Sequence, residues 1–122
     1  MLKYKYETHL HTSESSLCGE VSGKEYARYY KKMGYTGIFV TDHFLNGNTN
    51  VPEDQSWPER LDWFCRGYES AAEAGREIGL DVFFAWEYSH GWAHFLTYGL
   101  DKDWLLANHD ILSWDLMDYF KR

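Results

Sequence analysis

The chain has 122 residues, 44% of them hydrophobic and 19% aromatic, which is enough for one domain with its own core. Its 19 acidic and 12 basic residues give a formal net charge of −7, which argues against nucleic acid or an anionic membrane as a partner. Cys18 and Cys65 form no CxxC pair, no apolar signal segment is present, and no stretch is apolar enough to span a membrane, so we expect a soluble, cytoplasmic protein with reduced thiols.

The first part of the chain predicts a strand, a helix and a second strand. Residues 2–11 alternate between apolar or aromatic and polar side chains, which is the period of a β-strand. Ser22 and Glu25 form a capping box at the start of a helix that ends at Gly34. Residues 35–41 are a short apolar, β-branched run and predict a buried strand.

The middle of the chain predicts a loop and a long helix. Residues 46–55 are rich in Asn, Gly and Pro, which favours a loop. Ser56 and Glu59 form a second capping box with Pro58 in the first turn, and the apolar stripe that follows continues as one helix to Gly79.

The last part predicts two strands, at residues 82–86 and 94–98, and then two helices, at residues 102–109 and 113–122. Strands that alternate with helices at this spacing indicate an α/β architecture with a parallel sheet. In such folds functional side chains gather just past the carboxyl ends of the strands.

Each predicted strand has a metal-binding side chain at or near one end. These side chains are His9 and His11 on the first strand, Asp42 and His43 after the second, Glu87 after the third and His94 at the start of the fourth. Two histidines two residues apart on a strand face the same side and can reach one cation. Paired histidines are often structural, but four strand ends with ligand side chains favour a polynuclear site for Zn, Mn or Fe, bridged by Glu87.

Four sequence segments resemble, in the same order, the motifs of the PHP (polymerase and histidinol phosphatase) family. They are ETHLHTSESSLCG at 7–19, GIFVTDH at 37–43, AWE at 85–87 and HFLTYG at 94–99. The resemblance spans residues 4 to about 101, and the HxHT start together with the TDH strand end is more specific than either motif alone.

The resemblance implies a partial, distorted (β/α)7 barrel of about four parallel strands with flanking helices, which holds up to three divalent ions (Zn, Mn or Fe). By position, His9 and His11 would bind the first ion and Glu87 would bridge it to a second. His94 would complete part of the second site, and His43 would belong to the third. Glu87 and His43 are the expected catalytic residues of a phosphoesterase that hydrolyses a phosphomonoester by metal-activated water.

The loop after the first strand offers Glu14, Cys18 and Glu20 to the third site, and Glu14 is favoured. Cys18 is better explained as a small buried residue beside Gly19. Asp42 is expected to orient a ligand without binding an ion itself. Two further histidines are expected to play no part in the site: His90 in a solvent-facing turn and His109 near the predicted C-terminal helices.

The chain departs from the family pattern in two ways. It has AWE where relatives have Gly-x-Glu, and the later His-Pro and Asp-x-His motifs of the family are absent. A complete barrel needs about 200 residues or more, so we expect residues 1–122 to be a single PHP-like domain truncated before the C-terminal metal motifs. A second copy would then complete the open half-barrel. Four tryptophans serve that interface or pack the core: Trp86, Trp92, Trp104 and Trp114.

Three functions follow from these observations. The first is a metal-dependent phosphoesterase acting on a small phosphorylated substrate, with histidinol phosphate as one substrate assignment. The second is a PHP module of a DNA polymerase, which the acidic charge disfavours. The third is a truncated, non-catalytic fragment that binds metal and self-associates.

Overall fold

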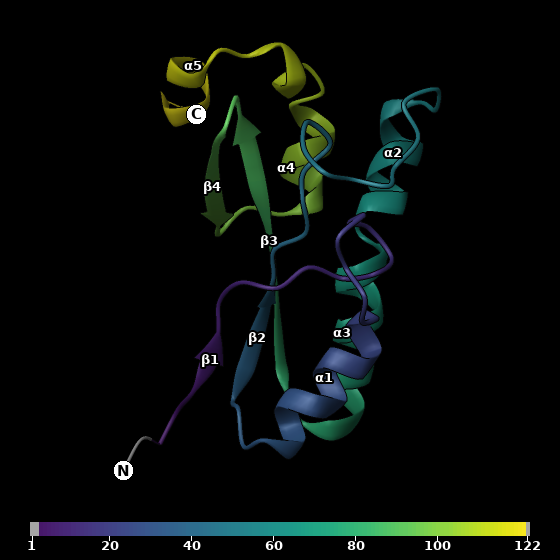
Figure 1. Ribbon diagram of the computed structural model, residues 1–122, viewed down its shortest axis with the longest axis vertical. Coiled ribbons are helices and arrows are strands. Elements are labelled where there is room, and N and C mark those ends of the chain that lie inside the picture. The colour runs from purple at the N-terminus through teal and green to yellow at the C-terminus, as the bar shows by residue number, and fades with distance from the viewer. Residues whose placement is uncertain (1–2, 122) are drawn as a thin grey trace.

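The computed structural model describes residues 3–121, and within this range a curled four-stranded sheet is flanked by helices (Figure 1). The strands lie in the order β1 (Tyr6–Glu7), β2 (Gly37–Val40), β3 (Asp81–His90) and β4 (Ala93–Tyr98). The helices are α1 (Gly23–Lys32), α2 (Trp57–Phe64), α3 (Arg66–Ile78), α4 (Lys102–Ala107) and α5 (Leu116–Lys121), with a 3-10 turn at Ile111–Ser113. This arrangement confirms the predicted α/β partial barrel. None of the helices in the described range is both long and apolar enough to cross a lipid bilayer.

The strands β1, β2 and β3 run parallel, as predicted, and β4 does not. Ile38 of β2 pairs with Glu7 on one side and Val82 on the other. β4 returns antiparallel to β3, with Leu96 opposite Glu87. The prediction of parallel strands is therefore wrong for β4. The reason is the short turn between β3 and β4, because a parallel neighbour requires a crossover of a dozen residues or so.

The first strand is shorter than the predicted range of residues 2–11, of which residue 2 lies outside the described range. Its ladder covers Tyr6–Glu7. Beyond it the chain stays attached to the extension of β2, because Leu10 donates its N–H to Thr41 Oγ1 at 2.9 Å and accepts the Thr41 N–H at 2.9 Å. The side chain of Leu10 is buried. His9 and His11, on either side of it, are thereby directed away from the core.

The single helix predicted up to Gly79 is two helices that meet at Cys65. Ser56 caps α2 as predicted, and its Oγ accepts the Glu59 N–H at 3.4 Å. Cys65 ends α2 and precedes α3. The break lets the two helices pack in different places: α2 against α4, and α3 against α1. Periodicity along the sequence does not reveal it, because both helices contribute apolar residues to one continuous stripe.

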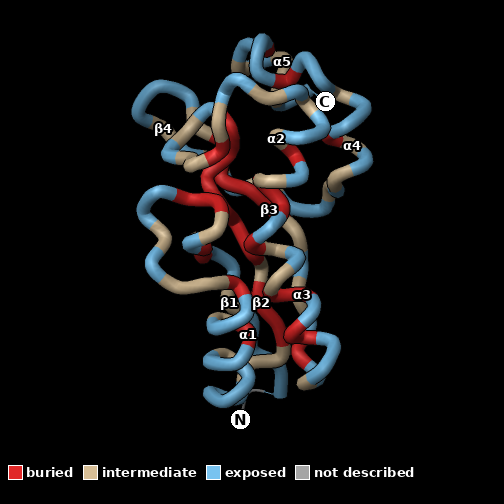
Figure 2. The backbone as a smooth tube through the Cα atoms, turned by 90° about the vertical axis from the view of Figure 1, so that its right-hand side faces the viewer, coloured by how far each residue is buried: buried red, intermediate tan, exposed pale blue. Residues whose placement is uncertain are grey.

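Two hydrophobic cores lie along the sheet, and Figure 2 shows buried backbone running through β2 and β3. One core lies between the sheet and the pair α1 and α3, and includes Ile38 and Val40. The other lies between β3, α2 and the helices that follow β4, and it contains Trp86 and Trp114 with Trp104 packed against them. These three tryptophans thus pack the core, whereas Trp92, in the turn between β3 and β4, is 93% exposed.

Candidate metal centre

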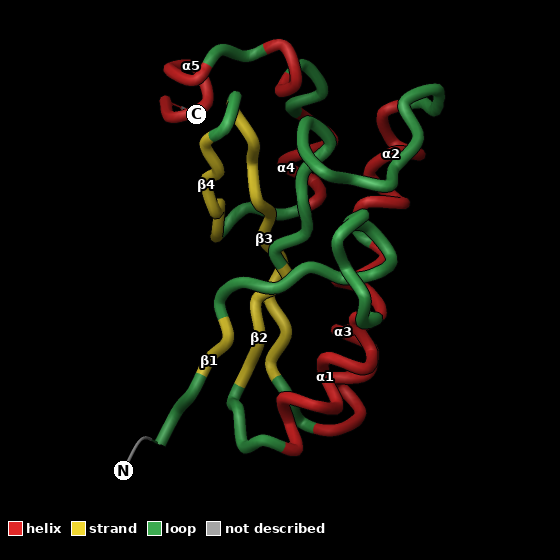
Figure 3. Tube along the Cα trace, in the orientation of Figure 1, coloured by secondary structure: helices red, strands yellow, loops and turns green. Residues whose placement is uncertain are grey.

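Three segments that are distant in sequence meet where β1 and β2 end (Figure 3), and backbone hydrogen bonds fix their register. His43 pairs with Glu87 as an isolated parallel bridge. Glu87 donates its N–H to Asp42 O at 2.9 Å and accepts the Phe44 N–H at 2.9 Å. The main chain itself therefore places the His43 and Glu87 side chains beside each other.

The carboxylate of Glu87 is the centre of the cluster. Its Oε1 lies 2.7 Å from His9 Nε2 and 3.6 Å from His11 Nε2. Its Oε2 lies 2.9 Å from His43 Nδ1 and 3.3 Å from His94 Nδ1. Each carboxylate oxygen thus faces its own pair of imidazoles, so the structure brings together all four histidines expected at the site.

The distances within the cluster fit a set of metal ligands. His9 Nε2 and His11 Nε2 are 3.3 Å apart, so they form a triangle with Glu87 Oε1. Nitrogen and oxygen ligands about 2.0–2.2 Å from one ion are roughly 2.9–3.5 Å from each other at octahedral to tetrahedral angles. The three distances of 2.7, 3.3 and 3.6 Å bracket this range, so shifts of a few tenths of an ångström would bring all three atoms to one ion. The second group, His43, Glu87 and His94, also has its ligand atoms within 4.8 Å of one another.

One buried atom shows that hydrogen bonding alone does not explain the cluster. His43 Nδ1 is buried and makes no hydrogen bond within the described chain, although it lies 2.9 Å from Glu87 Oε2. The distance is short but the direction is wrong for an N–H to point at the oxygen. A buried polar atom without a partner is costly, and an ion contacted by both atoms would satisfy it. The residues present therefore fit a divalent ion.

The protonation of the two most enclosed histidines suits metal binding. Burial, with His43 nearby, lowers the pKa of His11 to about 4. Burial also lowers the pKa of His43, against the attraction of Glu87. Both imidazoles are therefore neutral at neutral pH, which is the form that binds a metal ion.

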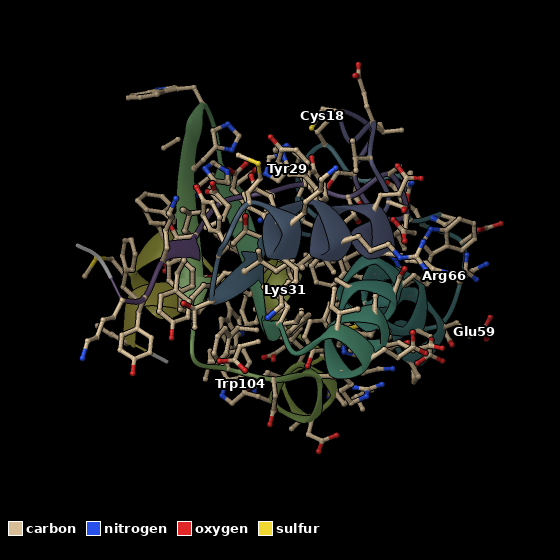
Figure 4. All side chains as sticks on the ribbon, turned by 90° about the horizontal axis from the view of Figure 1, so that it is seen from below. Cys18, Tyr29, Lys31, Glu59, Arg66 and Trp104 are labelled. Atoms are coloured by element: carbon tan, nitrogen blue, oxygen red, sulfur yellow. The ribbon has the colours of Figure 1, made fainter. Side chains whose placement is uncertain are left out.

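A third group consists of His11, Cys18 and His43. Cys18 lies on the loop that precedes α1 (Figure 4), and its Sγ is 3.3 Å from His11 Nδ1. Its side chain is exposed, so the prediction of a small buried residue is wrong. The sequence signal that could have found it is Gly19: a Cβ there would lie 2.2 Å from Thr12 O, so this glycine lets the loop fold back beside the histidines.

Glu14 does not join these groups. Its two carboxylate oxygens accept the Gly23 N–H at 3.0 and 3.2 Å, at the first residue of α1. The start of a helix is a favourable place for a carboxylate because its N–H groups are unpaired there. Of the three candidates on this loop, the structure therefore brings Cys18 to the histidines and holds Glu14 at the helix.

Asp42 organises the loop after β1 and does not contact a histidine side chain directly. Its carboxylate accepts the Thr12 N–H at 2.6 Å, the Thr12 hydroxyl at 2.8 Å and the Ser16 hydroxyl at 2.8 Å. Burial raises the pKa of Asp42 to about 6, against these hydrogen bonds. Ser16 Oγ in turn accepts the His43 N–H at 3.0 Å. The influence of Asp42 on the site is thus exerted through Ser16 and the main chain.

The remaining histidines differ in exposure. His9 and His94 have side chains 48% and 50% exposed, so the cluster is open to solvent on the side of these two residues. His94 Nδ1 is also 3.2 Å from Ser89 Oγ. His90 is exposed at the end of β3, as predicted, and His109 is exposed in the turn after α4.

No family model matches the chain, and no curated protein matches it. Among solved structures, a candidate metal-dependent phosphoesterase from Bifidobacterium adolescentis is similar, with 21% identity and a TM-score of 0.49. The match covers 78% of this chain and 27% of that one, so the chain spans about a quarter of the length of that protein. A likeness this low carries no argument about function, and the PHP family stays a resemblance in the sequence motifs.

Proposed function

We propose that this protein is a metal-dependent phosphoesterase of the PHP type that hydrolyses a small phosphomonoester. The observation that carries the proposal is the position of the Glu87 carboxylate, a buried group whose two oxygens each face a separate pair of histidines. A carboxylate placed in this way can bridge two ions. Pairs of ions about 3.5–4 Å apart are typical of phosphoester-hydrolysing sites.

The residues divide between the ions by distance. His9 Nε2, His11 Nε2 and Glu87 Oε1 would hold the first ion, and His43 Nδ1, His94 Nδ1 and Glu87 Oε2 the second. Imidazole and carboxylate together suit Zn, Mn or Fe. When bound, such ions activate water and stabilise the negative charge that develops on the phosphoryl oxygens.

Cys18 can serve this site in either of two roles. His11 faces Glu87 through Nε2 and Cys18 through Nδ1. If Nδ1 is protonated it donates to the sulfur, which fixes the tautomer that leaves Nε2 free for the first ion. Alternatively, the thiol and His43 would contribute to a third ion, the site to which the resemblance assigns His43 and for which the sequence favoured Glu14; His43 would then leave the second ion to His94 and Glu87.

The protein chain fixes the positions of the ligand side chains and leaves the cluster accessible to a substrate. Glu87 and His43 are held by the β3 main chain, so their positions are set before any ligand binds. His9 and His94 are half exposed, so a phosphate group can approach from their side. The ligand side chains can therefore bind ions and a phosphate group without a change in the main chain.

The test combines metal analysis with kinetics. The purified protein should contain divalent metal by mass spectrometry, and should hydrolyse at least one member of a phosphomonoester panel that includes histidinol phosphate. Glu87→Gln should lower kcat/KM by at least about 100-fold. His109→Asn, an exposed histidine outside the cluster, is the matched control and should leave it unchanged. A metal-free protein, or equal activity of the Glu87→Gln variant, would reject the proposal.

A further inference from the structure

A groove of about 360 Å³ runs beside the metal cluster on the α1 side, and we refer to it as the Tyr26–Tyr30 groove. Its lining residues are His9, Leu10, His11, Cys18, Tyr26 and Tyr30. One wall therefore consists of proposed metal ligands and the other of two tyrosines from α1. Because His9 and His11 are shared by the groove and the first ion site, the two adjoin each other.

The tyrosine wall is ordered by contacts outside the groove. Tyr26 and Tyr30 are one helical turn apart, with ring centroids separated by 6.2 Å. The Tyr30 hydroxyl donates to Glu7 Oε2 at 3.3 Å, and the other oxygen of Glu7 accepts the His9 N–H at 3.2 Å. The rings of Tyr30 and Tyr35 also pack edge to face, with their centroids 4.7 Å apart. Tyr30 is thus tied to the segment that carries His9, which couples the groove to the cluster.

Size and charge restrict what the groove can hold. Its volume is near the lower end of the roughly 300–1,000 Å³ typical of ligand sites, so a single ring is enough to fill it, and a larger ligand would extend into solvent. Two aromatic side chains favour a planar group that can stack on them or meet them edge to face. None of the lining residues is a lysine or arginine, and Glu7 lies just behind Tyr30. A second negative charge on the ligand would therefore be unfavourable there.

We propose that the Tyr26–Tyr30 groove binds the alcohol part of the substrate and selects phosphomonoesters whose alcohol carries a planar ring without negative charge. This inference rests on the proposed function, because the phosphate is assigned to the Glu87 cluster. Tyr26 is the specificity residue, since it lines the groove and the hydrogen bond to Glu7 is made by Tyr30. Tyr30 positions that wall through its bond to Glu7.

Binding of phosphonates tests the groove independently of turnover. Benzylphosphonate and ethylphosphonate carry the same phosphorus group and are not hydrolysed as esters are, so calorimetry on the manganese-loaded protein compares the ring with a small alkyl group. We expect benzylphosphonate to bind roughly tenfold more tightly. 4-Carboxybenzylphosphonate, with a second anionic group, should lose that advantage.

Variants locate the preference on Tyr26. Tyr26→Ala should remove the roughly tenfold difference while ethylphosphonate binds as before, and Tyr26→Phe should retain it because the ring remains. Met33→Ala is the matched control, since Met33 is an uncharged residue at the end of the same helix, is 53% exposed and does not line the groove. Unchanged melting temperature and metal content would show that the variants are intact.

The outcomes of these experiments distinguish a failure of the groove assignment from a failure of the phosphoesterase proposal. Equal binding of the two phosphonates, a preference that survives Tyr26→Ala, or no binding of either would each overturn the groove assignment, even if the protein hydrolyses other esters. Tight, Tyr26-dependent binding of benzylphosphonate without hydrolysis of any phosphomonoester would support the groove and reject the phosphoesterase proposal.

Discussion

At the scale of single residues, Glu87 is the group that the fold can least easily accommodate without an ion. Its side chain is 7% exposed, and its neighbours in the described chain are imidazoles rather than Lys or Arg. Burying a carboxylate is costly unless the charge is compensated. Neutral histidines supply no positive charge, so bound cations are the natural compensation.

A substitution of Glu87 should therefore separate stability from metal binding. Glu87→Gln removes the buried charge at nearly constant volume, so the metal-free variant should be at least as stable as the metal-free wild type. Zinc at about 100 times its Kd should stabilise the wild type by about 2.7 kcal/mol and the variant by much less. Thermal melts with and without zinc measure both effects, and equal zinc stabilisation of the two proteins would contradict the assignment of Glu87.

The two cysteines should differ in reactivity. Cys18 is exposed, whereas Cys65 is buried, and burial raises the pKa of its thiol to about 12. Only the thiolate reacts rapidly, so iodoacetamide at pH 8 should modify Cys18 alone in the folded protein. Mass spectrometry of the digested protein measures the alkylation of each cysteine. Bound metal should protect Cys18 if its sulfur is a ligand; full labelling of the metal-loaded protein would instead favour the orienting role.

The stability of the metal-free protein should fall in acid because of His11. The pKa of His11 is about 4 in the folded chain against 6.5 as the ordinary value, with burial as the main cause. The unfolded chain thus takes up a proton that the folded chain resists, and stability is lost as the pH falls from about 6.5 to about 4. Urea unfolding across this range should show a shallower pH dependence for His11→Asn, and identical pH dependence would contradict the environment described for His11.

At the scale of elements, α3 supports the metal cluster through its contact with the loop after β1. Gly67 of α3 lies against the loop that carries Thr12, and a Cβ on it would be 2.0 Å from Thr12 Oγ1 and 2.8 Å from Asp42 Oδ2. The Thr12–Asp42 hydrogen bonds hold this loop beside β2. Gly67 therefore links helix packing to the position of His11.

Enlarging Gly67 should disturb both packing and the site. Gly67→Ala should lower the free energy of unfolding by about 1–3 kcal/mol, because a side chain is forced into a filled space. It should also weaken metal binding through the Thr12 loop. Glu73→Ala, an exposed position on the same helix, should change neither quantity by more than about 0.5 kcal/mol. Urea unfolding and metal titration provide the comparison, and a fully stable Gly67→Ala protein would contradict this packing.

Local signals in the sequence were sufficient to predict most of the helices and strands. Ser22 and Ser56 mark helix starts, because capping depends on residues within one turn. The break at Cys65 depends instead on the different helices against which α2 and α3 pack, which no local pattern records. The approach of Cys18 to His11 left one signal in the sequence, Gly19, which lets the loop fold back onto Thr12. The histidines and Glu87 were predictable as a group because strand ends in an α/β fold converge. Glu14 was predicted at the third metal site, but its carboxylate instead accepts the Gly23 N–H at the start of α1.

At the scale of the whole molecule, the described sheet leaves aromatic side chains exposed on one face. Phe39 and Phe83 stack at 4.6 Å between Tyr6 and Tyr98, and Tyr6, Phe83 and Tyr98 are exposed. The β4 edge beside them, AHFLTY, contains no lysine, glutamate or proline that would discourage pairing. The homo-oligomer expected from the sequence stays a prediction, and this face is where it would form.

Light scattering coupled to size-exclusion chromatography checks the prediction of self-association. We expect a mass above that of the 14.5 kDa monomer, which falls toward the monomer for Phe83→Ser. Leu112→Ser, an exposed apolar position far along the chain from the sheet, is the control. A monomeric wild-type protein at all concentrations would leave the aromatic face without a second copy.

We propose that the Glu87 carboxylate bridges two divalent ions. Anomalous diffraction at the metal absorption edge, on crystals grown with zinc or manganese, would locate these ions. We predict two peaks, one next to His9 and His11 and the other next to His43 and His94, about 3.5–4 Å apart with Glu87 between them. The absence of metal at this position, or a single ion that Glu87 does not contact, would contradict it.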